Sequence, residues 1–565
     1  MSKRKKVIAG AVILAIVLVI VLAAIAIYRF LAPSNTKAEP DFGIKQNEIA
    51  LIVDGKLLEE KGIVIEGKKY VPAETASRYM DQRIYVDAAE KILSYATPDG
   101  MIQADVNETT YTISKEIKEA EEPVLRLENE KLYVSLSFVV EHASGDIQEY
   151  KEPSRVVIHN DRTKTYTFAA VNGATRLRKG PGKKYAWITE VSEGTEVVVE
   201  SEIKQENEYM AVTTKDGITG YIPVDDVNSE KEKAWEFQKT PEIFTQKSFG
   251  KTVCLGWHQV TNETGSSMLY SGIDQAGPMN VISPTLFALS DNKGNFTSLA
   301  NTGYVSQAHA RGLQVWGLIN DFNDGINLDT VLGTTSIRKK LVNGLVGAAI
   351  QYDLDGINID FENVKASSAA AYLEFLRELV LKCHANDIIV SVDAYTPAEY
   401  NSYYDLAEQG RVVDYVVLMA YDEHYAGSEE SGSVSSIGFV ESGVKGVLAK
   451  VPAERVIVGL PFYTRLWCET KTKNGVKVTS TAYGMSGAES VVRANDATPK
   501  WDKSTGQYYA SFRGESGTYK IWLEEETSIK KKLEVVMAGK VAGVAFWKLG
   551  FERAATWLTI EDALK

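Results

Sequence analysis

The residues best suited to chemistry lie in one short segment, LDGINIDFEN, which runs from residue 354 to residue 363. Asn358, Asp360 and Glu362 alternate there with three large apolar residues. Alternate side chains of a β-strand point to opposite faces, so the pattern predicts a strand with one polar and one apolar face. Burying carboxyl groups costs several kcal/mol unless partners or function compensate. Two neighbouring carboxyl groups suit proton transfer, in which one acts as acid or base and the other holds charge.

Eight short apolar runs from Ser248 onward alternate with amphipathic helical patterns, which is typical of a parallel α/β fold. Eight is the number of strands in a closed (β/α)8, or TIM, barrel. The expected strands read TVCLGWH, NVISPTLFAL, LQVWGLIN, LDGINIDFE, IIVSVDAY, DYVVLMAY, RVIVGLPFY and VAGVAFW. The chain between Trp467 and Lys520 is far longer than one helix needs, so we expect an insertion between strands seven and eight.

Functional side chains of such barrels lie at the carboxyl ends of the strands. Glu362 closes the fourth expected strand, Tyr421 and Asp422 the sixth, Tyr463 the seventh and Trp547 the eighth. We therefore expect these side chains to meet at one mouth of the barrel. The polar face of the fourth strand should point to the barrel axis, and its apolar face (Ile357, Ile359 and Phe361) should pack against the surrounding helices.

Three motifs now indicate a family. DGINIDFE resembles the DGxDxDxE signature of glycoside hydrolase family 18, and MAYD (419–422) and Trp547 follow in the family's order. DGINIDFEN, MAYDEH and GLPFYTRLW are similar to the branch that contains bacterial spore-cortex and cell-wall N-acetylglucosaminidases. The resemblance covers residues 248–565 and implies a TIM-barrel hydrolase of N-acetylglucosamine polymers that needs no cofactor.

The resemblance also implies a mechanism, in which the acetamido group of the substrate is the nucleophile. Glu362 would protonate the leaving oxygen and then activate water. Asp360 would orient the acetamido group and stabilise the oxazolinium ion, and Tyr421 would donate a hydrogen bond to the acetamido oxygen. Trp547 would form the floor beneath the distorted sugar ring, although it could instead fill the core.

Further residues are candidates for substrate contact: Asn358, Asp422, Tyr463, Arg465, Glu423 and Trp257. Trp257 could equally cap the barrel, as could Phe287, and His424 could equally be a structural hydrogen-bonding group. Asp355 is expected to end the preceding turn.

Asn358 departs from the family's pattern, which commonly has an aspartate at this position. We expect Asn358 to hydrogen-bond Asp360 without sharing a negative charge with it. The loss of a like-charged neighbour should favour the ionised form of Asp360, whose charge would keep Glu362 protonated.

The N-terminus carries the clearest sign of location. MSKRKK places four positive charges before an uncharged run, Val7–Tyr28, that is long enough to cross a bilayer. Residues 1–31 are therefore expected to be a cytoplasmic basic segment and a single transmembrane anchor, with the remainder outside the cell and facing the wall. A cleavable signal peptide is the alternative. Residues 32–43 form a polar tether.

Three segments precede the expected barrel. Residues 45–161 contain a weak repeat in which Tyr70 and Val71 match Tyr133 and Val134, and they resemble the stalk modules named for the copper amine oxidase N-terminus. Residues 163–227 indicate a small β-barrel and resemble a bacterial Src-homology-3 type domain. Its Tyr185, Trp187 and Tyr221 could line a groove for wall peptides or could belong to its core. Residues 228–247 are expected to form a linker.

Composition excludes several functions. The net charge is −13, and no Lys/Arg cluster lies beyond the N-terminus, so nucleic acid is not an expected partner. The three cysteines are far apart and the six histidines form no ligand motif, so neither a disulfide framework nor a metal is expected. The sequence thus predicts a multi-domain, membrane-anchored glycosidase that cleaves β-1,4 N-acetylglucosamine linkages of peptidoglycan. A chitinase and a non-catalytic wall-binding lectin are the alternatives, and the sequence sets no oligomeric state.

Overall fold

A computed structural model describes residues 3–203, 205–473 and 475–565. The chain divides into two compact units. The N-terminal unit comprises Met1–Ile84, Val106–Thr109 and Ala120–Pro241. The C-terminal unit comprises Tyr85–Asp105, Thr110–Glu119 and Glu242–Lys565.

Within the described residues of the C-terminal unit, eight parallel strands form a closed barrel. They are β20 (Val253–His258), β21 (Val281–Leu289), β23 (Gln314–Asn320), β24 (Gly356–Asp360), β25 (Ile389–Tyr395), β26 (Tyr415–Met419), β27 (Val456–Pro461) and β33 (Gly543–Trp547). Pairing of β20 with both β33 and β21 closes the barrel, and β22 (Phe296–Ser298) adds an antiparallel edge. All eight predicted strands are therefore confirmed.

The two faces of the strands pack into different hydrophobic clusters. Ile357, Ile359 and Phe361 belong to the outer cluster between strands and helices, where the Phe361 ring stacks on Phe375 at 5.6 Å. A separate inner cluster lies on the other face of the strands and includes Trp257 and Trp316. Full burial of a large apolar side chain contributes roughly 1.5–3 kcal/mol, so the alternation seen in the sequence fixes which face of β24 points to the axis.

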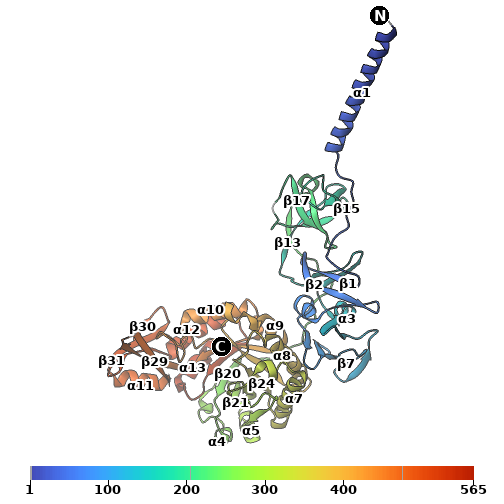
Figure 1. Ribbon diagram of the computed structural model, residues 1–565. Coiled ribbons are helices and arrows are strands. Elements are labelled where there is room, and N and C mark those ends of the chain that lie inside the picture. The colour runs from blue at the N-terminus through green and yellow to red at the C-terminus, as the bar shows by residue number, and fades with distance from the viewer. Residues whose placement is uncertain (1–2, 204, 474) are drawn as a thin grey trace. The chain divides into compact units, whose positions relative to one another are not determined.

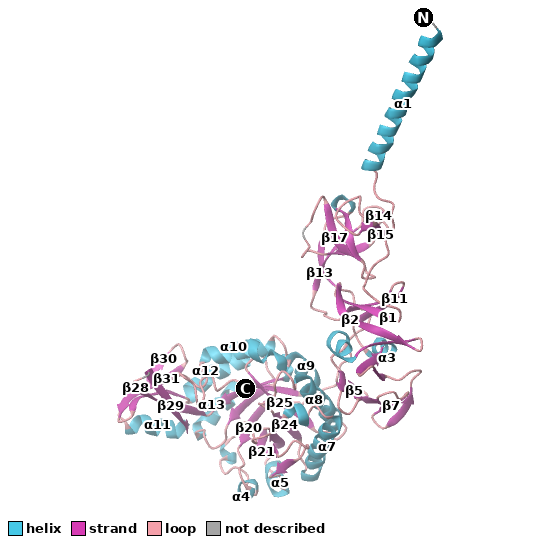
Figure 2. Ribbon diagram, viewed as in Figure 1, coloured by secondary structure: helices cyan, strands magenta, loops and turns pink. Residues whose placement is uncertain are grey.

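A ring of helices covers the outside of the barrel (Figures 1 and 2). Its helices are α5 (Thr302–His309), α7 (Thr335–Tyr352), α8 (Ala369–His384), α9 (Leu406–Val412), α10 (Ile437–Leu448), α12 (Glu526–Ala538) and α13 (Ala554–Leu564), with short α4 (Glu263–Ser266) and α6 (Leu328–Val331). Asp353, in the left-handed conformation (φ 59°), ends α7 and turns the chain toward β24. Asp355 accepts hydrogen bonds from Val315 N and the His309 ring, both at 2.8 Å, which is a structural role.

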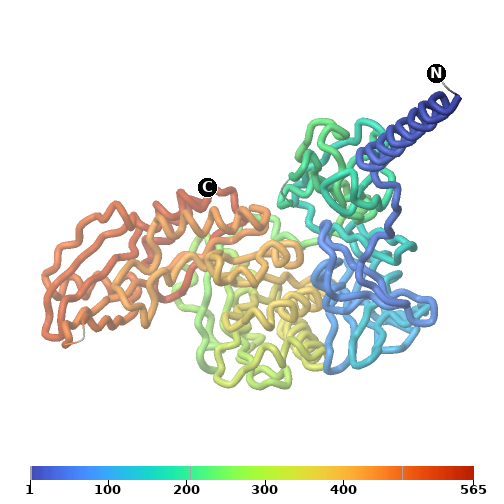
Figure 3. Tube along the Cα trace, turned by 45° about the horizontal axis from the view of Figure 1, so that its top comes forward, coloured from blue at the N-terminus to red at the C-terminus, as the bar shows by residue number. Residues whose placement is uncertain are grey.

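The insertion between β27 and β33 is a five-stranded antiparallel sheet with one helix, which form a lobe beside the barrel (Figure 3). Its elements are β28 (Tyr463–Thr472), β29 (Gly475–Gly484), α11 (Met485–Ala494), β30 (Lys500–Asp502), β31 (Gln507–Gly514) and β32 (Gly517–Leu523). The described insertion therefore begins before Trp467. Tyr463 is the first residue of the insertion and not the last residue of the seventh strand.

The N-terminal unit contains a seven-stranded sheet in the order β11-β12-β1-β2-β3-β10-β9. Its strands are β1 (Glu48–Val53), β2 (Lys56–Ile65), β3 (Lys68–Pro72), β9 (Leu125–Glu128), β10 (Lys131–Ser135), β11 (Asp146–Lys151) and β12 (Ser154–His159), with α2 (Ala73–Thr75), a π-helix (Ala76–Met80) and α3 (Leu136–His142). The two halves of the sequence repeat pair with each other, because Val134 lies opposite Val71.

A second sheet from the same segment belongs to the C-terminal unit. It consists of β4 (Ile84–Asp87), β5 (Ile92–Thr97), β6 (Gly100–Asp105), β7 (Thr110–Ile113) and β8 (Glu116–Glu119). Asp87 accepts a hydrogen bond of 2.7 Å from the first backbone N–H of α7, at Thr335, and Tyr85 donates to Gly333 O at 2.8 Å. Residues 45–161 are thus divided between the two units.

Another seven-stranded sheet of the N-terminal unit follows the order β15-β14-β18-β17-β16-β13-β19. Its strands are β13 (Thr165–Ala170), β14 (Thr175–Arg178), β15 (Trp187–Val191), β16 (Glu196–Val199), β17 (Tyr209–Thr213), β18 (Thr219–Pro223) and β19 (Lys231–Ala234). Strand β19 comes from the segment expected to be a linker and pairs with β13.

The segment expected to be a tether lies along the edge of this sheet. Ala38 N donates to Trp187 O at 2.8 Å, and Trp187 N donates to Thr36 O at 3.0 Å. The Trp187 ring nitrogen also donates to Asn35 O. Trp187, one of the predicted groove aromatics, is therefore in contact with the chain's own residues 35–38.

Helix α1 (Lys3–Leu31) precedes this segment and has a mean hydropathy of 3.3 over its most apolar window. Its length and composition suit a membrane span, and a signal sequence has the same properties.

Candidate active site

The polar face of β24 continues past the end of the strand to Glu362. Strand β24 ends at Asp360, which is opposite Asn320 of β23 in the parallel register. Asp321, the next residue after β23, is 2% exposed and accepts hydrogen bonds of 3.0 Å from Glu362 N and Asn363 N. Asp321 therefore fixes the backbone from which the Glu362 side chain extends.

The Glu362 carboxyl group is half-buried and accepts a hydrogen bond from the Tyr395 hydroxyl at the end of β25. Burial raises its pKa, and the charges of Asp321 and Asp422 act in the same direction. The hydrogen bonds from Tyr395 and Asp360 lower it. The raised pKa favours the protonated form of Glu362, which a general acid requires.

Asp360 is 7% exposed and faces the barrel axis. Burial raises the pKa of Asp360 well above its usual value, and the charges of Asp393, Glu362 and Asp321 raise it further. A hydrogen bond between the Asp360 and Glu362 carboxyl groups acts in the same direction for Asp360. Among the described residues, Asp360 Oδ1 has no hydrogen-bond partner. The protonated form of Asp360 is thus favoured, and its Oδ1 is left unpaired among the described residues.

Asn358 lies deeper in the barrel and is fully buried. Its Nδ2 donates to Asp393 Oδ1 at 2.9 Å and to Ser391 Oγ at 3.1 Å, and its Oδ1 accepts from Trp257 Nε1 at 3.0 Å. The expected hydrogen bond to Asp360 is therefore wrong. Asn358 Oδ1 also accepts from Ser283 Oγ of β21 at 3.1 Å, so Asn358 joins β24 to β20, β21 and β25 from inside the barrel.

The expected ionisation of Asp360 is also wrong. Asn358 removes one like charge, but Asp393 of the neighbouring strand supplies another. Burial raises the pKa of Asp393 as well, and so does the charge of Glu362. The carboxyl groups therefore still disfavour full ionisation of one another.

The site lies within the residues that match a known family. The sequence profile described as Glycosyl hydrolases family 18 matches residues 257–552, just over half of the chain. The chain belongs to glycoside hydrolase family 18. It is a glycoside hydrolase.

Two curated relatives are from Bacillus subtilis. An "Uncharacterized glycosylase YvbX" is 28% identical over 54% of this chain and 90% of that protein. A "Cortical fragment-lytic enzyme" is 27% identical over 41% of this chain and 55% of that protein. The chain thus spans nearly the whole length of the first relative and about half of the second.

Solved structures show the same fold. The C-terminal domain of a putative chitinase from Desulfitobacterium hafniense has a TM-score of 0.50 and 21% identity over 56% of this chain and 100% of that chain. The Bacillus cereus spore cortex-lytic enzyme SleL has a TM-score of 0.50 and 18% identity over 59% of this chain and 78% of that chain.

The profile described as Copper amine oxidase N-terminal domain matches residues 52–159.

Aromatic side chains of the family 18 barrel gather beside the carboxyl groups. Trp257 contacts Tyr421 and Trp547 edge to face, at 6.4 and 6.1 Å between ring centres, and Tyr421 contacts Tyr463 at 6.4 Å. Burial raises the pKa of Tyr421 well above its usual value, and the charges of Asp393, Asp360 and Glu362 raise it further. The Tyr421 hydroxyl therefore remains a hydrogen-bond donor in this site.

These aromatics differ in exposure. Trp257 is 1% exposed and belongs to the inner cluster, so its ring lies below the surface on which a sugar could stack. Trp547 and Tyr421 are half-buried and pack against the same cluster from outside. Phe287 is 2% exposed and lies in the outer cluster against Phe296, away from the barrel axis.

Asp422, Tyr463 and Arg465 form a group on the insertion side of the mouth. The Tyr463 hydroxyl donates to Asp422 Oδ1 at 2.5 Å. Loss of solvent raises the pKa of Asp422, whereas this hydrogen bond and the charge of Arg465 lower it. Arg465 donates to Ser480 Oγ at 3.2 Å within the insertion sheet.

Glu423 and His424 turn away from this group. Glu423 accepts from Ser436 N at 2.7 Å and from Ser436 Oγ at 3.0 Å, at the start of α10. The His424 ring donates to Ser433 O at 2.9 Å. Both residues therefore shape the loop after β26, and neither side chain is oriented toward the carboxyl pair by these contacts.

Three residues that the sequence reasoning missed complete the site: Asp321, Asp393 and Tyr395. Ser391, Asp393 and Tyr395 alternate along β25 as the polar residues do along β24, so the same two-residue period would have identified the last two. Asp321 gives no such signal, because it follows its strand and acts through backbone N–H groups. Among the described residues, no group of three or more His, Cys, Asp or Glu is arranged to hold a metal ion.

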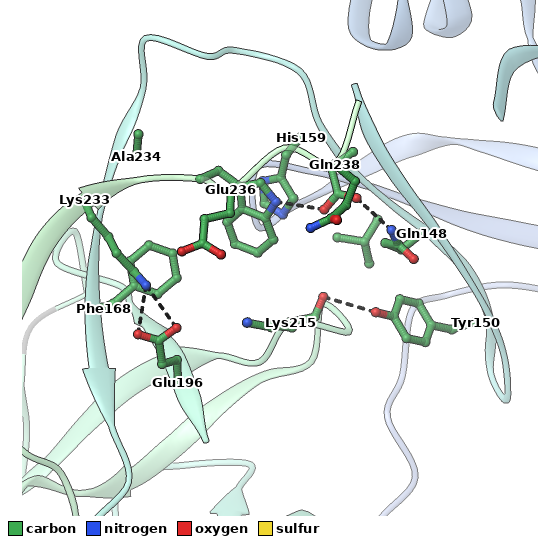
Figure 4. A pocket seen from close by; sticks show the side chains of 13 residues that line it. Gln148, Tyr150, His159, Phe168, Glu196, Lys215, Lys233, Ala234, Glu236 and Gln238 are labelled. Atoms are coloured by element: carbon green, nitrogen blue, oxygen red, sulfur yellow. Dashed lines mark hydrogen bonds and ion pairs between the residues drawn. The ribbon is translucent and has the colours of Figure 1, made fainter. Parts of the chain in front are cut away.

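The cavities that the described residues form outside the carboxyl pair include two, one in each compact unit. One, of about 420 Å³, lies beside Asp321 and Asn363 and has exposed Phe322 on its wall. The other, of about 220 Å³, belongs to the N-terminal unit (Figure 4). His159 stacks there on Trp235 at 3.6 Å, and Lys233 forms an ion pair with Glu196 at 2.9 Å. None of the residues predicted for catalysis lines this second cavity.

Tyr395→Phe tests the electrostatics of Glu362. The variant loses the hydrogen bond that lowers the pKa of Glu362, so this pKa rises and the alkaline limb of the kcat profile moves to higher pH. Hydrogen bonds to charged groups contribute roughly 1.5–3 kcal/mol, so kcat should fall about tenfold or more. A pH–rate profile of purified enzyme provides the measurement, and an unmoved alkaline limb would contradict the assignment.

Asp393→Asn tests the second strand's carboxyl group. Burial is the largest cause of the raised pKa of Asp360, and the charge of Asp393 is the next largest cause. Asp393→Asn removes this charge and leaves burial. The pKa of Asp360 therefore falls, and the acid limb of the kcat profile moves to lower pH. Ser391→Ala is the matched control, because it changes another Asn358 partner on β25 without changing charge. A shift of equal size in both variants would show that the effect is not electrostatic.

Proposed function

We propose that this enzyme hydrolyses β-1,4 linkages next to N-acetylglucosamine in peptidoglycan, with retention of configuration and with the substrate's acetamido group as nucleophile. The observation that carries the proposal is the Asp360–Glu362 carboxyl pair, in which the pKa of each carboxyl group is raised. The charges of the same two residues also raise the pKa of Tyr421. The cortical fragment-lytic relative supports a wall substrate.

In the first step Glu362 gives its proton to the leaving glycosidic oxygen while the acetamido oxygen attacks the anomeric carbon. The Tyr421 hydroxyl donates a hydrogen bond to the acetamido oxygen and orients it. Positive charge develops on the acetamido group, and Asp360 stabilises this charge. Trp547 supports the apolar face of the sugar.

In the second step the Glu362 carboxylate takes a proton from water, which attacks the oxazolinium ion and opens it. Tyr395 stabilises Glu362 in this ionised state through its hydrogen bond. Asp422, Tyr463 and Arg465 contact sugar hydroxyls or peptide groups beside the cleaved bond. The two steps of the reaction thus use the same glutamate, first as acid and then as base.

We also propose that α1 anchors the enzyme in the cell membrane with its basic N-terminus in the cytoplasm. Lys3, Arg4, Lys5 and Lys6 precede the apolar helix, and positive charge is retained on the cytoplasmic side. The barrel then faces the wall. The small β-barrel at residues 163–227 is a bacterial Src-homology-3 type domain in this proposal.

A chitinase is the second candidate, because curated relatives include Chitinase 1 of Aphanocladium album, which is 25% identical over 43% of this chain. The two substrates differ in the lactyl peptide that peptidoglycan carries. A lectin is disfavoured because the acid and its supporting groups are all present.

Glu362→Gln tests the reaction. Loss of the general acid should lower kcat by about 10²–10⁴-fold while binding persists. The measurement is the release of reducing ends from purified peptidoglycan and from chitin oligomers. Release by the wild-type enzyme from peptidoglycan alone supports the wall substrate, and release from chitin alone supports the chitinase. Release from neither polymer supports the lectin.

Protease treatment of intact cells tests the topology. The proposed orientation exposes everything after α1, so added protease should remove the barrel while a cytoplasmic marker stays intact. Full protection of the barrel would refute the orientation. A mature protein that begins after residue 31 would show a cleaved signal instead of an anchor.

A further inference from the structure

The loop after β26 holds Tyr421 next to a strained turn. Asp422 has φ +58°, a left-handed conformation that non-glycine residues adopt at a cost. Such a turn persists only when surrounding contacts fix it. The contacts come from residues 433–436 of the same loop, so the position of Tyr421 depends on what holds that segment.

Hydrogen bonds join the two parts of the loop on both sides of Tyr421. Ser435 Oγ donates to Ala420 O at 2.7 Å, directly before Tyr421. After it, Glu423 N donates to Val434 O at 2.9 Å. Ser433 O accepts from His424 N at 3.2 Å and from the His424 ring. Residues 433–435 thus act as a template for residues 420–424.

The template is attached to the insertion through Gln507. Ser433 Oγ donates to Gln507 Oε1 at 2.5 Å and accepts from Ser435 N at 3.0 Å. Gln507 is the first residue of β31 and is fully buried. Its Nε2 donates to Glu524 Oε1 at 2.6 Å. One side chain therefore connects the loop to Glu524.

Glu524 forms a fully buried ion pair with Lys532 of α12. Ser528 Oγ donates to Glu524 Oε2 at 2.8 Å, so both carboxylate oxygens have partners. The charges of Glu423 and Glu525 also face Lys532. A buried ion pair adds little net stability compared with apolar residues, but breaking it by removing one partner is strongly destabilising. Such pairs fix geometry more than they add free energy in some proteins, and here the geometry is that of the loop.

We propose that the Lys532–Glu524 ion pair positions Tyr421 for catalysis, through Gln507 and Ser433. The proposal rests on the catalytic role proposed for Tyr421. Lys532, Glu524 and Gln507 touch no substrate and are positioning residues. The insertion and α12 thereby set the geometry of a reaction that takes place on β24 and β26.

Gln507→Leu in the full chain is the first test, because it keeps the size of the side chain and removes both hydrogen bonds. Misplacement of a catalytic group by about 1 Å costs up to 10²-fold, so kcat measured well below Tm should fall about 10–100-fold with little change in KM. In a Tyr421→Phe background the same substitution should have less than about a twofold effect, because coupled residues are not additive. The substrate is whichever polymer the wild-type enzyme cleaves, so the result does not depend on its identity.

Lys532→Met is the second test, and it adds a pH signature. Burial raises the pKa of Glu524, and Lys532 opposes this rise. Without Lys532 the pKa of Glu524 rises further, so its protonated form is favoured. The hydrogen bonds of Glu524 to Gln507 and Ser528 are therefore kept at low pH and lost as pH rises through the pKa of Glu524. The kcat and Tm of the variant relative to wild type should fall as pH rises through the raised pKa of Glu524, and Glu524→Gln combined with Lys532→Met should remove this pH dependence.

Lys531→Met on the same helix is the matched control, since Lys531 forms an exposed pair with Glu534. It should leave kcat and Tm close to those of wild type. Ser433→Ala is the variant to use if Gln507→Leu does not fold. The proposal is overturned if Gln507→Leu or Ser433→Ala lowers Tm but keeps the wild-type kcat. It is also overturned if either variant lowers kcat equally with and without the Tyr421 hydroxyl.

Discussion

The site depends on one constraint, which is the removal of several neighbouring carboxyl groups from water at the end of a closed barrel. Asp360, Asp393 and Glu362 come from two adjacent strands and have raised pKa values, with burial as the largest cause for each. Burial and like charges at short range both disfavour full ionisation of the group, so the protonated forms of its carboxyl groups are favoured. A proton donor and a charge-stabilising partner therefore exist in the same small space, which is what acid catalysis on a glycosidic bond requires.

The barrel enforces this constraint through its two-residue period. The outward residues of β24 are fixed by packing against α8, where Phe361 stacks on Phe375. This packing leaves the polar residues no other direction than the axis. Asn358 then links four strands (β20, β21, β24 and β25) from within, and Asp321 holds the backbone of Glu362. Catalysis and stability are thus served by the same alternation, with the apolar face supplying the free energy that holds the polar face in place.

The sequence was sufficient to predict what depends on local pattern. The eight strands, the insertion before β33, and the opposed faces of β24 all follow from periodicity and spacing. The partners of Asn358 could not be predicted, because they come from β20, β21 and β25 and depend on register between strands distant in sequence. The raised pKa of Asp360 was missed for a related reason: burial raises it most, and the charge of Asp393 on another strand raises it further. Glu423 and Trp257 were expected at the substrate because they lie near strand ends, yet the local turn directs one to α10 and burial hides the other.

The most direct measurement is the protonation of the carboxyl group of Asp360 in the folded enzyme. Carboxyl ¹³C chemical shifts of labelled aspartate, compared between the wild-type enzyme and Asp360→Asn across the pH range, report that single group. The account predicts that Asp360 stays protonated well above the pH at which an ordinary aspartate ionises. Titration of Asp360 at the usual value for an exposed aspartate would contradict it, since burial and the neighbouring carboxyl groups would then not favour the protonated form of Asp360.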